Sequence, residues 1–159
     1  MTLGEAAFDK IISLYRSSKV PSVQRACLLA LAVAPTEALI QRLLEASVNS
    51  SLIRTQDTGI IMRALASSGH LGARLAWSFL QSRFDDVFAA EQFGVVRTLQ
   101  SITAYLHTDS DLAELEALLD NQAANKVGDA SRKSLLEALR HNAYWVSTTR
   151  SAFVNALVE

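Results

Sequence analysis

Histidine is the first side chain to test for chemistry in this 159-residue chain, because a catalytic zinc site needs histidines at fixed spacing. The usual helical zinc motif has two histidines one turn apart with a glutamate between them. His70, His107 and His141 have no histidine or cysteine at metal-ligand spacing. Each is expected near a helix end, in a solvated or capping role. The sequence therefore predicts no metal site in these residues.

Nucleophilic catalysis also lacks its usual motifs. The serines occur in no Gly-x-Ser-x-Gly turn and in no Ser-x-x-Lys motif with its partner motifs. The single cysteine, Cys27, lies in the apolar run RACLLALAV and is expected to pack as a small hydrophobic side chain. The six glycines are not clustered as a phosphate-binding loop requires. We therefore expect no catalytic residue here.

Acidic side chains gather in one segment, TDSDLAELEALLD, at residues 108–120. Their spacing places them largely opposite the leucines of the same predicted helix, which favours a solvated face over an acid–base pair. Thr108, followed three residues later by Asp111, resembles a capping box with Asp in place of Glu.

The arginines in the middle of the chain allow two interpretations. They are spread over consecutive predicted helices, at Arg54, Arg63, Arg74, Arg83 and Arg97. One interpretation is ordinary surface ion pairing. The other is that some of them line an inner surface and offer guanidinium groups to the carboxylates or carbonyls of a peptide. Arg97 is the candidate for this second role, because its helix is otherwise poor in charge.

The hydrophobic pattern is helical almost throughout. Leu39, Ile40, Leu43, Leu44 and Val48, for example, share one helical face. We expect eight or nine helices of about 10 to 16 residues each, with the longest irregular stretch at residues 121–131. Short connectors make neighbouring helices antiparallel. The predicted fold is therefore all-α, an irregular α-superhelix of antiparallel helix pairs of the HEAT or armadillo type.

Composition limits the partners. The 15 Lys and Arg nearly balance the 16 Asp and Glu, whereas nucleic-acid binding needs a basic excess or a basic face, so no nucleic-acid partner is expected. No apolar run reaches the roughly 20 residues that span a bilayer, so we expect no membrane contact from this segment. Asn49-Ser50-Ser51 fits the glycosylation pattern, which makes Asn49 a candidate acceptor if the protein is secreted. The sequence predicts no particular cellular compartment.

Residues 50–80, SSLIRTQDTGIIMRALASSGHLGARLAWSFL, resemble a segment of the C-terminal helical domain of the aminopeptidase-N family of zinc aminopeptidases. In that family the opening I-R-x-Q-D is followed by a Gly and then L-A-W-x-F. The likeness continues in order over nearly the whole chain, including a closing N-x-x-W-like segment. The matching positions of the motifs include Arg54, Gln56, Asp57, Trp77, Phe79 and Trp145.

The resemblance implies that residues 1–159 are a single helical domain, the C-terminal part of a larger zinc aminopeptidase. It implies that zinc belongs to the catalytic domain of the parent chain, with no cofactor in these residues. The implied partners are that catalytic domain and the peptide substrates in the chamber that the helical domain encloses. Residues 90–101 fit the family pattern poorly.

Roles for the motif residues follow from the resemblance. Asp57 is expected to cap a helix, and Arg54 to pair with a neighbouring carboxylate or carbonyls. Independently of the resemblance, the aromatic residues Trp77, Phe79 and Trp145 are expected to be core anchors and not a ligand box.

Two further expectations concern association. A free-standing HEAT-like adaptor that binds another protein on its concave face is the alternative to the aminopeptidase domain. In a shortened solenoid the first helix lacks a neighbour, which predicts an exposed apolar face and a homo-oligomer formed through it. The face includes Phe8, Ile11, Ile12 and Tyr15.

Overall fold

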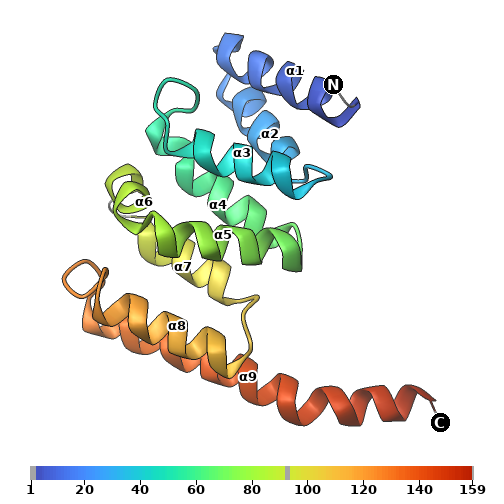
Figure 1. The fold of residues 1–159 in the computed structure, drawn as a ribbon, viewed down its shortest axis with the longest axis vertical. Coiled ribbons are helices and arrows are strands. Elements are labelled where there is room, and N and C mark those ends of the chain that lie inside the picture. The colour runs from blue at the N-terminus through green and yellow to red at the C-terminus, as the bar shows by residue number, and fades with distance from the viewer. Residues whose placement is uncertain (1–2, 92–93, 159) are drawn as a thin grey trace.

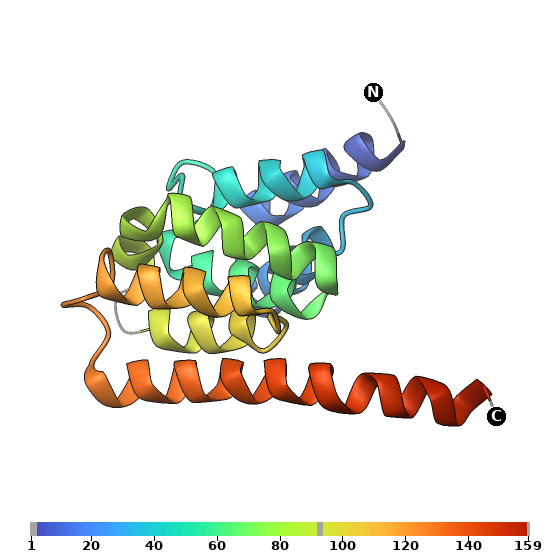
Figure 2. The ribbon, with the colours of Figure 1, turned by 60° about the horizontal axis from the view of Figure 1, so that its bottom comes forward.

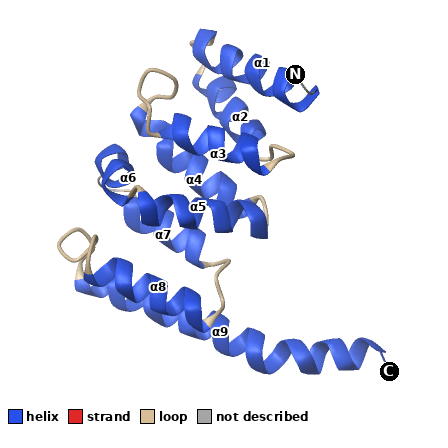
Figure 3. Ribbon diagram, in the orientation of Figure 1, coloured by secondary structure: helices blue, strands red, loops and turns tan. Residues whose placement is uncertain are grey.

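The computed structural model describes residues 3–91 and 94–158, and this part of the chain contains helices and loops but no strand (Figure 3). It contains nine α-helices and one 3-10 helix, η1 (Thr55–Asp57). The all-α prediction is confirmed, as is the expected number of helices. The α-helices are α1 (Leu3–Ser17), α2 (Pro21–Leu31), α3 (Glu37–Ser47), α4 (Thr58–Ser67), α5 (His70–Ser82), α6 (Phe84–Glu91), α7 (Val95–Thr103), α8 (Asp109–Asp120) and α9 (Asp129–Val158).

Local signals set several helix starts. Pro21 is the first residue of α2, where a missing N–H costs little. The Thr36 hydroxyl accepts a hydrogen bond from the Leu39 N–H at the start of α3. Thr108 and Asp111 form both hydrogen bonds of a capping box at the start of α8. The longest predicted irregular stretch lies largely in the loop between α8 and α9, which ends at Asp129.

The helices stack in two layers (Figures 1 and 2). Helices α2, α4, α7 and the first half of α9 lie side by side in one layer, and α1, α3, α5 and α8 form the other. Apart from α6, the chain alternates between the layers. The pairs that pack across them include α1 with α2, α4 with α5, and α8 with α9. This arrangement is consistent with the predicted α-superhelix.

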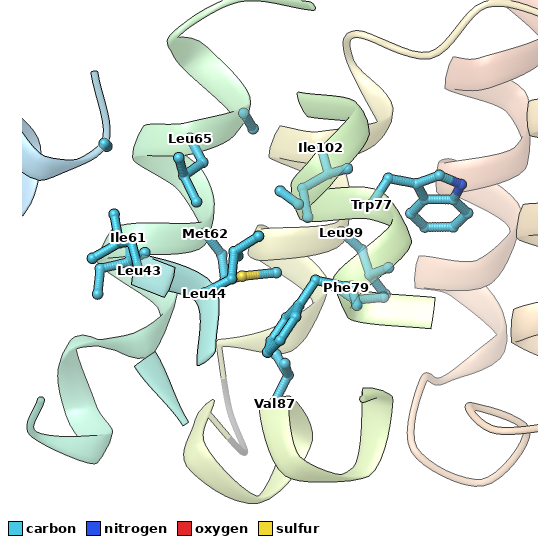
Figure 4. Packing of buried hydrophobic residues seen from close by; sticks show 14 of the residues in the cluster. Leu43, Leu44, Ile61, Met62, Leu65, Trp77, Phe79, Val87, Leu99 and Ile102 are labelled. Carbon is cyan, nitrogen blue, oxygen red and sulfur yellow. The ribbon is translucent and has the colours of Figure 1, made fainter. Parts of the chain in front are cut away.

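The hydrophobic core lies between the two layers (Figure 4). Leu43 of α3, Ile61 and Leu65 of α4 and Leu99 of α7 are all completely buried. Gly72 allows α5 to approach α4 closely, because a Cβ atom at this position would overlap the carbonyl oxygen of Leu65. The buried side chains thus hold each helix against both its layer and the opposite one.

The N-terminal helix is packed more completely than expected. Phe8 and Tyr15 are 3% and 2% exposed, and Ile11 and Ile12 are half-buried, so the prediction of an open face made of these four residues is wrong. The reason is that α1 lies on α2, and the guanidinium of Arg42 on α3 covers the Phe8 ring at 4.9 Å from its centre.

Helix α9 continues beyond the helices on which it packs (Figures 1 and 2). Leu135 and Leu139 are buried, and the side-chain amide of Asn142 lies 3.4 Å from the Thr103 carbonyl oxygen at the end of α7. Past Val146 every side chain whose burial the structure describes is exposed. Trp145 is 55% exposed, so the expectation that it packs in the core is wrong. The helical pattern of the sequence continues past the point at which other helices pack against α9.

Candidate functional site

Arg97 lies on the exposed side of α7, where it lines an open pocket of about 510 Å³. The pocket lies across three neighbouring helices of one layer, α2, α4 and α7. Arg25 of α2 and Arg63 of α4 also line it. The structure therefore brings three arginines together that lie far apart in the sequence.

Helical periodicity places these side chains on the outer surface of the layer. On α7, Arg97 and Ser101 are one turn apart and both line the pocket, whereas Leu99 and Ile102 on the opposite side are buried. The same spacing relates Arg63 to the polar Ser67 on α4. The pocket is therefore a polar outer surface backed by the core.

Arg63 is held in a fixed position. Its Nη1 atom donates to Glu91 Oε1 at 2.9 Å and to Thr98 Oγ1 at 2.8 Å. The Glu91 side chain is only 6% exposed and lies against Gly59, where any Cβ atom would overlap its carboxylate. Arg63 is thus neutralised by a carboxylate for which Gly59 leaves space.

Arg25 and Arg97, in contrast, have no carboxylate partner among the residues that the structure describes. No acidic side chain of this described part lines the pocket either. Two exposed guanidinium groups therefore face one polar pocket with no countercharge. Such a surface suits carboxylates or carbonyl oxygens, which accept charge-assisted hydrogen bonds from arginine.

The other three arginines form ordinary ion pairs. Arg54 pairs with Asp57 at 2.7 Å, Arg74 with Asp111, and Arg83 with Asp86 at 2.5 Å. Ordinary ion pairing is thus confirmed for these three arginines, whereas a peptide-binding role for Arg97 stays a prediction. Arg25 was missed by the sequence analysis, although it is the one charged residue of α2, just as Arg97 is the one charged residue of α7.

The Arg54-x-Gln56-Asp57 motif joins η1 to the N-terminal helix. Asp57 Oδ2 accepts hydrogen bonds from the Tyr15 hydroxyl at 2.6 Å and from Arg54 Nε at 2.8 Å. The Tyr15 oxygen in turn accepts from the Arg54 backbone N–H at 3.1 Å. Burial and the Asp57 carboxylate raise the pKa of Tyr15 above its ordinary value of 10.0. Gln56 is exposed.

The predicted capping role of Asp57 is wrong. Asp57 occupies the N-cap position of α4, but its side chain makes no capping hydrogen bond there. The carboxylate is instead used by Tyr15, which lies 42 residues earlier in the chain. The spacing of residues around Asp57 in the sequence does not indicate that partner.

The second motif joins α5 to α8. Trp77 is completely buried, and its indole Nε1 donates to Glu114 Oε2 at 2.7 Å. Phe79 is 9% exposed, with the Arg83 guanidinium 5.8 Å from the centre of its ring. The predicted solvated face of α8 therefore needs correction, because Glu114 and Asp111 both bond to α5.

Asp111 is the most buried acid of that segment, at 3% exposed. Burial of the carboxylate acts to raise its pKa. Hydrogen bonds from the backbone N–H groups of Thr108 and His107, from the Thr108 hydroxyl and from Arg74 outweigh this effect and lower the pKa below its ordinary value of 3.8. The charged form is therefore the one that the fold stabilises.

Asn49 lies in the exposed loop after α3. Its side-chain oxygen accepts from the Ser51 backbone N–H at 3.1 Å and from the Ser51 hydroxyl at 2.7 Å. Glycosylation at this residue stays a prediction.

The three histidines line one further pocket, of about 470 Å³, beside Trp145. Within the described ranges, no cluster of three or more His, Cys, Asp or Glu side chains is arranged to hold a metal ion. Across the same residues, no helix combines the length and the apolar character needed to cross a bilayer.

Residues 1–141 match the family described as ERAP1-like C-terminal domain. Aminopeptidase A of Gloydius brevicauda is 24% identical over 149 residues, which are 92% of this chain and 16% of that protein. Aminopeptidase N of Bos taurus is 28% identical over 122 residues, or 74% of this chain and 12% of that protein. The thyrotropin-releasing hormone-degrading ectoenzyme of Homo sapiens is 26% identical over 146 residues, or 90% of this chain and 13% of that protein.

The chain thus spans about one-sixth of the length of the relatives that it matches most fully. The match covers the motif residues Arg54, Asp57, Trp77 and Phe79; the hydrogen bonds of Asp57 join η1 to α1, and that of Trp77 joins α5 to α8. The chain therefore belongs to the ERAP1-like C-terminal domain family, the C-terminal domain of aminopeptidase N-family enzymes.

Proposed function

We propose that this chain is the C-terminal helical domain of a zinc-dependent aminopeptidase, where it encloses the peptide-substrate chamber and supports domain closure without a catalytic centre of its own. Family membership supports the proposal, since two of the relatives described above are named as aminopeptidases. The observation that carries it is the pocket that Arg25 and Arg97 both line, with no acidic side chain of the described residues among its lining.

The role of the two arginines would be electrostatic. Each guanidinium can donate two hydrogen bonds to a carboxylate or to backbone carbonyl oxygens of a peptide. On an open surface, water and salt weaken such contacts. Closure of the chamber would exclude water and strengthen them, because the effective dielectric constant falls. The arginines would position a peptide and form or break no bond.

The proposed partners are the catalytic domain of the same parent chain and its peptide substrates. The hydrolytic step, and the zinc that supports it, would belong to that catalytic domain. The isolated chain is accordingly expected to be inert.

Substitution of the two arginines in the full-length parent polypeptide tests the proposal. We expect Arg97→Ala and Arg25→Ala each to raise KM for a peptide that carries a free carboxylate by about three- to tenfold, with little change in kcat, as when a contact is lost that ground state and transition state share. Arg16→Ala is the matched control, because Arg16 is an exposed arginine outside the pocket.

A second measurement separates the proposed domain from an adaptor. Hydrolysis of a fluorogenic aminoacyl amide is measured for the purified chain with added zinc and for the full-length parent. Activity in the parent alone supports the proposal. Activity in neither favours the free-standing HEAT-like adaptor, and activity that stays with the repurified chain overturns the absence of a catalytic centre here. An unchanged KM in both arginine variants removes the positioning role.

A further inference from the structure

Two histidines that are far apart in the sequence lie beside each other in the fold. His70 is the first residue of α5, and His107 lies in the loop between α7 and α8. Their ring centres are 6.3 Å apart, and their ring planes are inclined at 60°. The start of α5, this loop and the middle of α9 lie on the same side of the stack in both ribbon views (Figures 1 and 2). The fold thus pairs two imidazoles whose spacing along the chain predicted no metal site.

The carboxylate of Asp111 fixes both sides of this pair. Its Oδ2 atom accepts a hydrogen bond from the His107 backbone N–H at 3.0 Å, which holds the loop that carries His107. Its Oδ1 atom pairs with Arg74, which lies one helical turn after His70 on α5. The two segments that carry the imidazoles are therefore tied to the same buried side chain.

The ring nitrogens of the two histidines are available to a further partner. Among the residues that the structure describes, none donates a hydrogen bond to, or accepts one from, the rings of His70 and His107. His70 is exposed and His107 is half-buried, so solvent reaches both. A neutral imidazole has one nitrogen with a free lone pair, which is the group that binds a metal ion.

The pocket beside the pair favours a particular class of ion. It has a volume of about 470 Å³, and His141, Tyr105 and Trp145 also line it. No Lys, Arg, Asp or Glu occurs among the described lining residues. A cation therefore meets no positive charge in the lining, and the ligands that it meets are nitrogens. Imidazole suits Cu²⁺, Zn²⁺ and Ni²⁺, whereas Mg²⁺ and Ca²⁺ require oxygen ligands.

The distance between the rings fits one ion bound to both. With metal–nitrogen bonds of about 2.1 Å, two imidazoles on one ion have their ring centres between about 4.5 Å apart, for bonds at a right angle, and about 6.5 Å apart, for opposite bonds. The observed 6.3 Å lies within this range, near its upper end. Because His70 is exposed, its side chain can rotate to narrow the angle without disturbing the core.

We propose that His70 and His107 together bind one divalent ion of the late first transition row, with water completing its coordination. Cu²⁺ should bind most tightly, because the affinity of a nitrogen site rises along this series to copper. His141 lines the same pocket, but no group of three or more potential ligands in the described ranges is arranged around one ion, so the site is assigned to the pair. The ion would join the start of α5 to the α7–α8 loop.

Calorimetric titration of the purified chain with Cu²⁺ tests the inference. We expect one ion per chain with a Kd on the order of 10 µM, a weak but specific affinity. Cys27 is buried, so its thiol should not compete. His70→Ala and His107→Ala should each raise the Kd at least about tenfold, whereas His141→Ala, the matched control from the same pocket, should change it less than about threefold. Circular dichroism checks the fold, and His70→Gln at the same exposed position is a second variant if His107→Ala fails to fold.

Trp145 reports where the ion binds. It lines the same pocket and is 55% exposed, whereas Trp77, the other tryptophan of the chain, is completely buried. Cu²⁺ quenches indole fluorescence at short range, so quenching should follow the calorimetric curve and reverse on addition of EDTA. Trp145→Phe should lose most of the quenching and keep the binding. His70→Ala should lose both.

Several outcomes overturn the inference. A Kd above about 1 mM would show non-specific binding only. An unchanged Kd in both His70→Ala and His107→Ala would place the ion elsewhere, as would quenching that persists in Trp145→Phe. A loss in His141→Ala as large as in the other two variants would replace the pair with a site of three imidazoles. None of these outcomes depends on peptidase activity, so each leaves the proposed function untouched.

Discussion

The Tyr15 hydroxyl donates a 2.6 Å hydrogen bond to Asp57, and this bond ties the first helix of the domain to the start of α4. Asp57 is 4% exposed, so its carboxylate depends on hydrogen bonds from neighbouring protein groups. Arg54 completes the group by pairing with Asp57 at 2.7 Å. A family motif in the middle of the chain thus fixes the position of a helix through a residue 42 positions earlier.

Removal of the Tyr15 hydroxyl should therefore destabilise the whole domain. Tyr15→Phe removes one of the two side chains that donate to Asp57 and leaves the Arg54 backbone N–H without its acceptor. We expect a loss of about 1 to 3 kcal/mol, because buried polar groups that lose a partner keep the cost of leaving water. The free energy of unfolding in urea is the measurement. Tyr144→Phe is the control, since Tyr144 is 68% exposed and should change little.

Asp111→Asn should weaken the contact between α5 and α8. The substitution removes the charge that Arg74 pairs with, and it leaves one oxygen where two accept bonds from Arg74, His107 and Thr108. The expected loss is about 1 to 3 kcal/mol, as for hydrogen bonds to a charged group. Asp109→Asn, in the same first turn but exposed, is the control and should fall well below that. Equal losses in the two variants would contradict the buried role of Asp111.

The same carboxylate predicts an acid dependence of stability. The pKa of Asp111 is lowered in the fold from its ordinary value of 3.8, so the folded state binds a proton less readily than the unfolded state. Its contribution is then fully present above that ordinary value and is lost as the pH falls through the lowered folded pKa. As the pH falls below about 4, the ordinary range of Asp, the native chain should lose stability more steeply than Asp111→Asn. Parallel slopes for the two proteins would show that another group carries the effect.

Gly72→Ala should separate α4 from α5. A methyl group at residue 72 would overlap the Leu65 carbonyl oxygen, which belongs to the backbone and cannot rotate away. Overpacking of this kind costs about 1 to 3 kcal/mol, measurable as a lower thermal midpoint. Gly128→Ala provides the control, because no atom lies within 4 Å of the added carbon there. A destabilisation that is no larger at residue 72 than at residue 128 would contradict the close approach.

Much of the fold could be predicted because its signals are local. Apolar spacing identified the helices, and Thr36 and Thr108 marked helix starts through bonds to residues three positions later. The Asp57 capping prediction failed for the opposite reason. Its carboxylate could accept a hydrogen bond from the start of its own helix or from a distant residue, and only the folded chain brings Tyr15 within reach.

The candidate site was predictable in part. Arg97 stood out as the single charge of its helix, and the same reasoning applies to Arg25, which was overlooked. That these two residues share a pocket depends on α2, α4 and α7 lying side by side, which no spacing within one helix can reveal. The exposure of Trp145 has a similar origin, because a continuous helical pattern does not show where the supporting helices end.

The length of α9 has a consequence for how the molecule opens. A helix of 30 residues extends about 45 Å at 1.5 Å per residue. Its unsupported end, residues 147–158, has 12 residues, which is at the lower limit of the roughly 12 to 15 residues below which a lone helix is marginal in water. Amide hydrogens should therefore exchange in two groups within this one helix, slowly as far as Asn142 and rapidly from Ser147 onward. The rapid group would slow as soon as any surface covers it, so hydrogen exchange along α9 reports directly how much of the protein is bound.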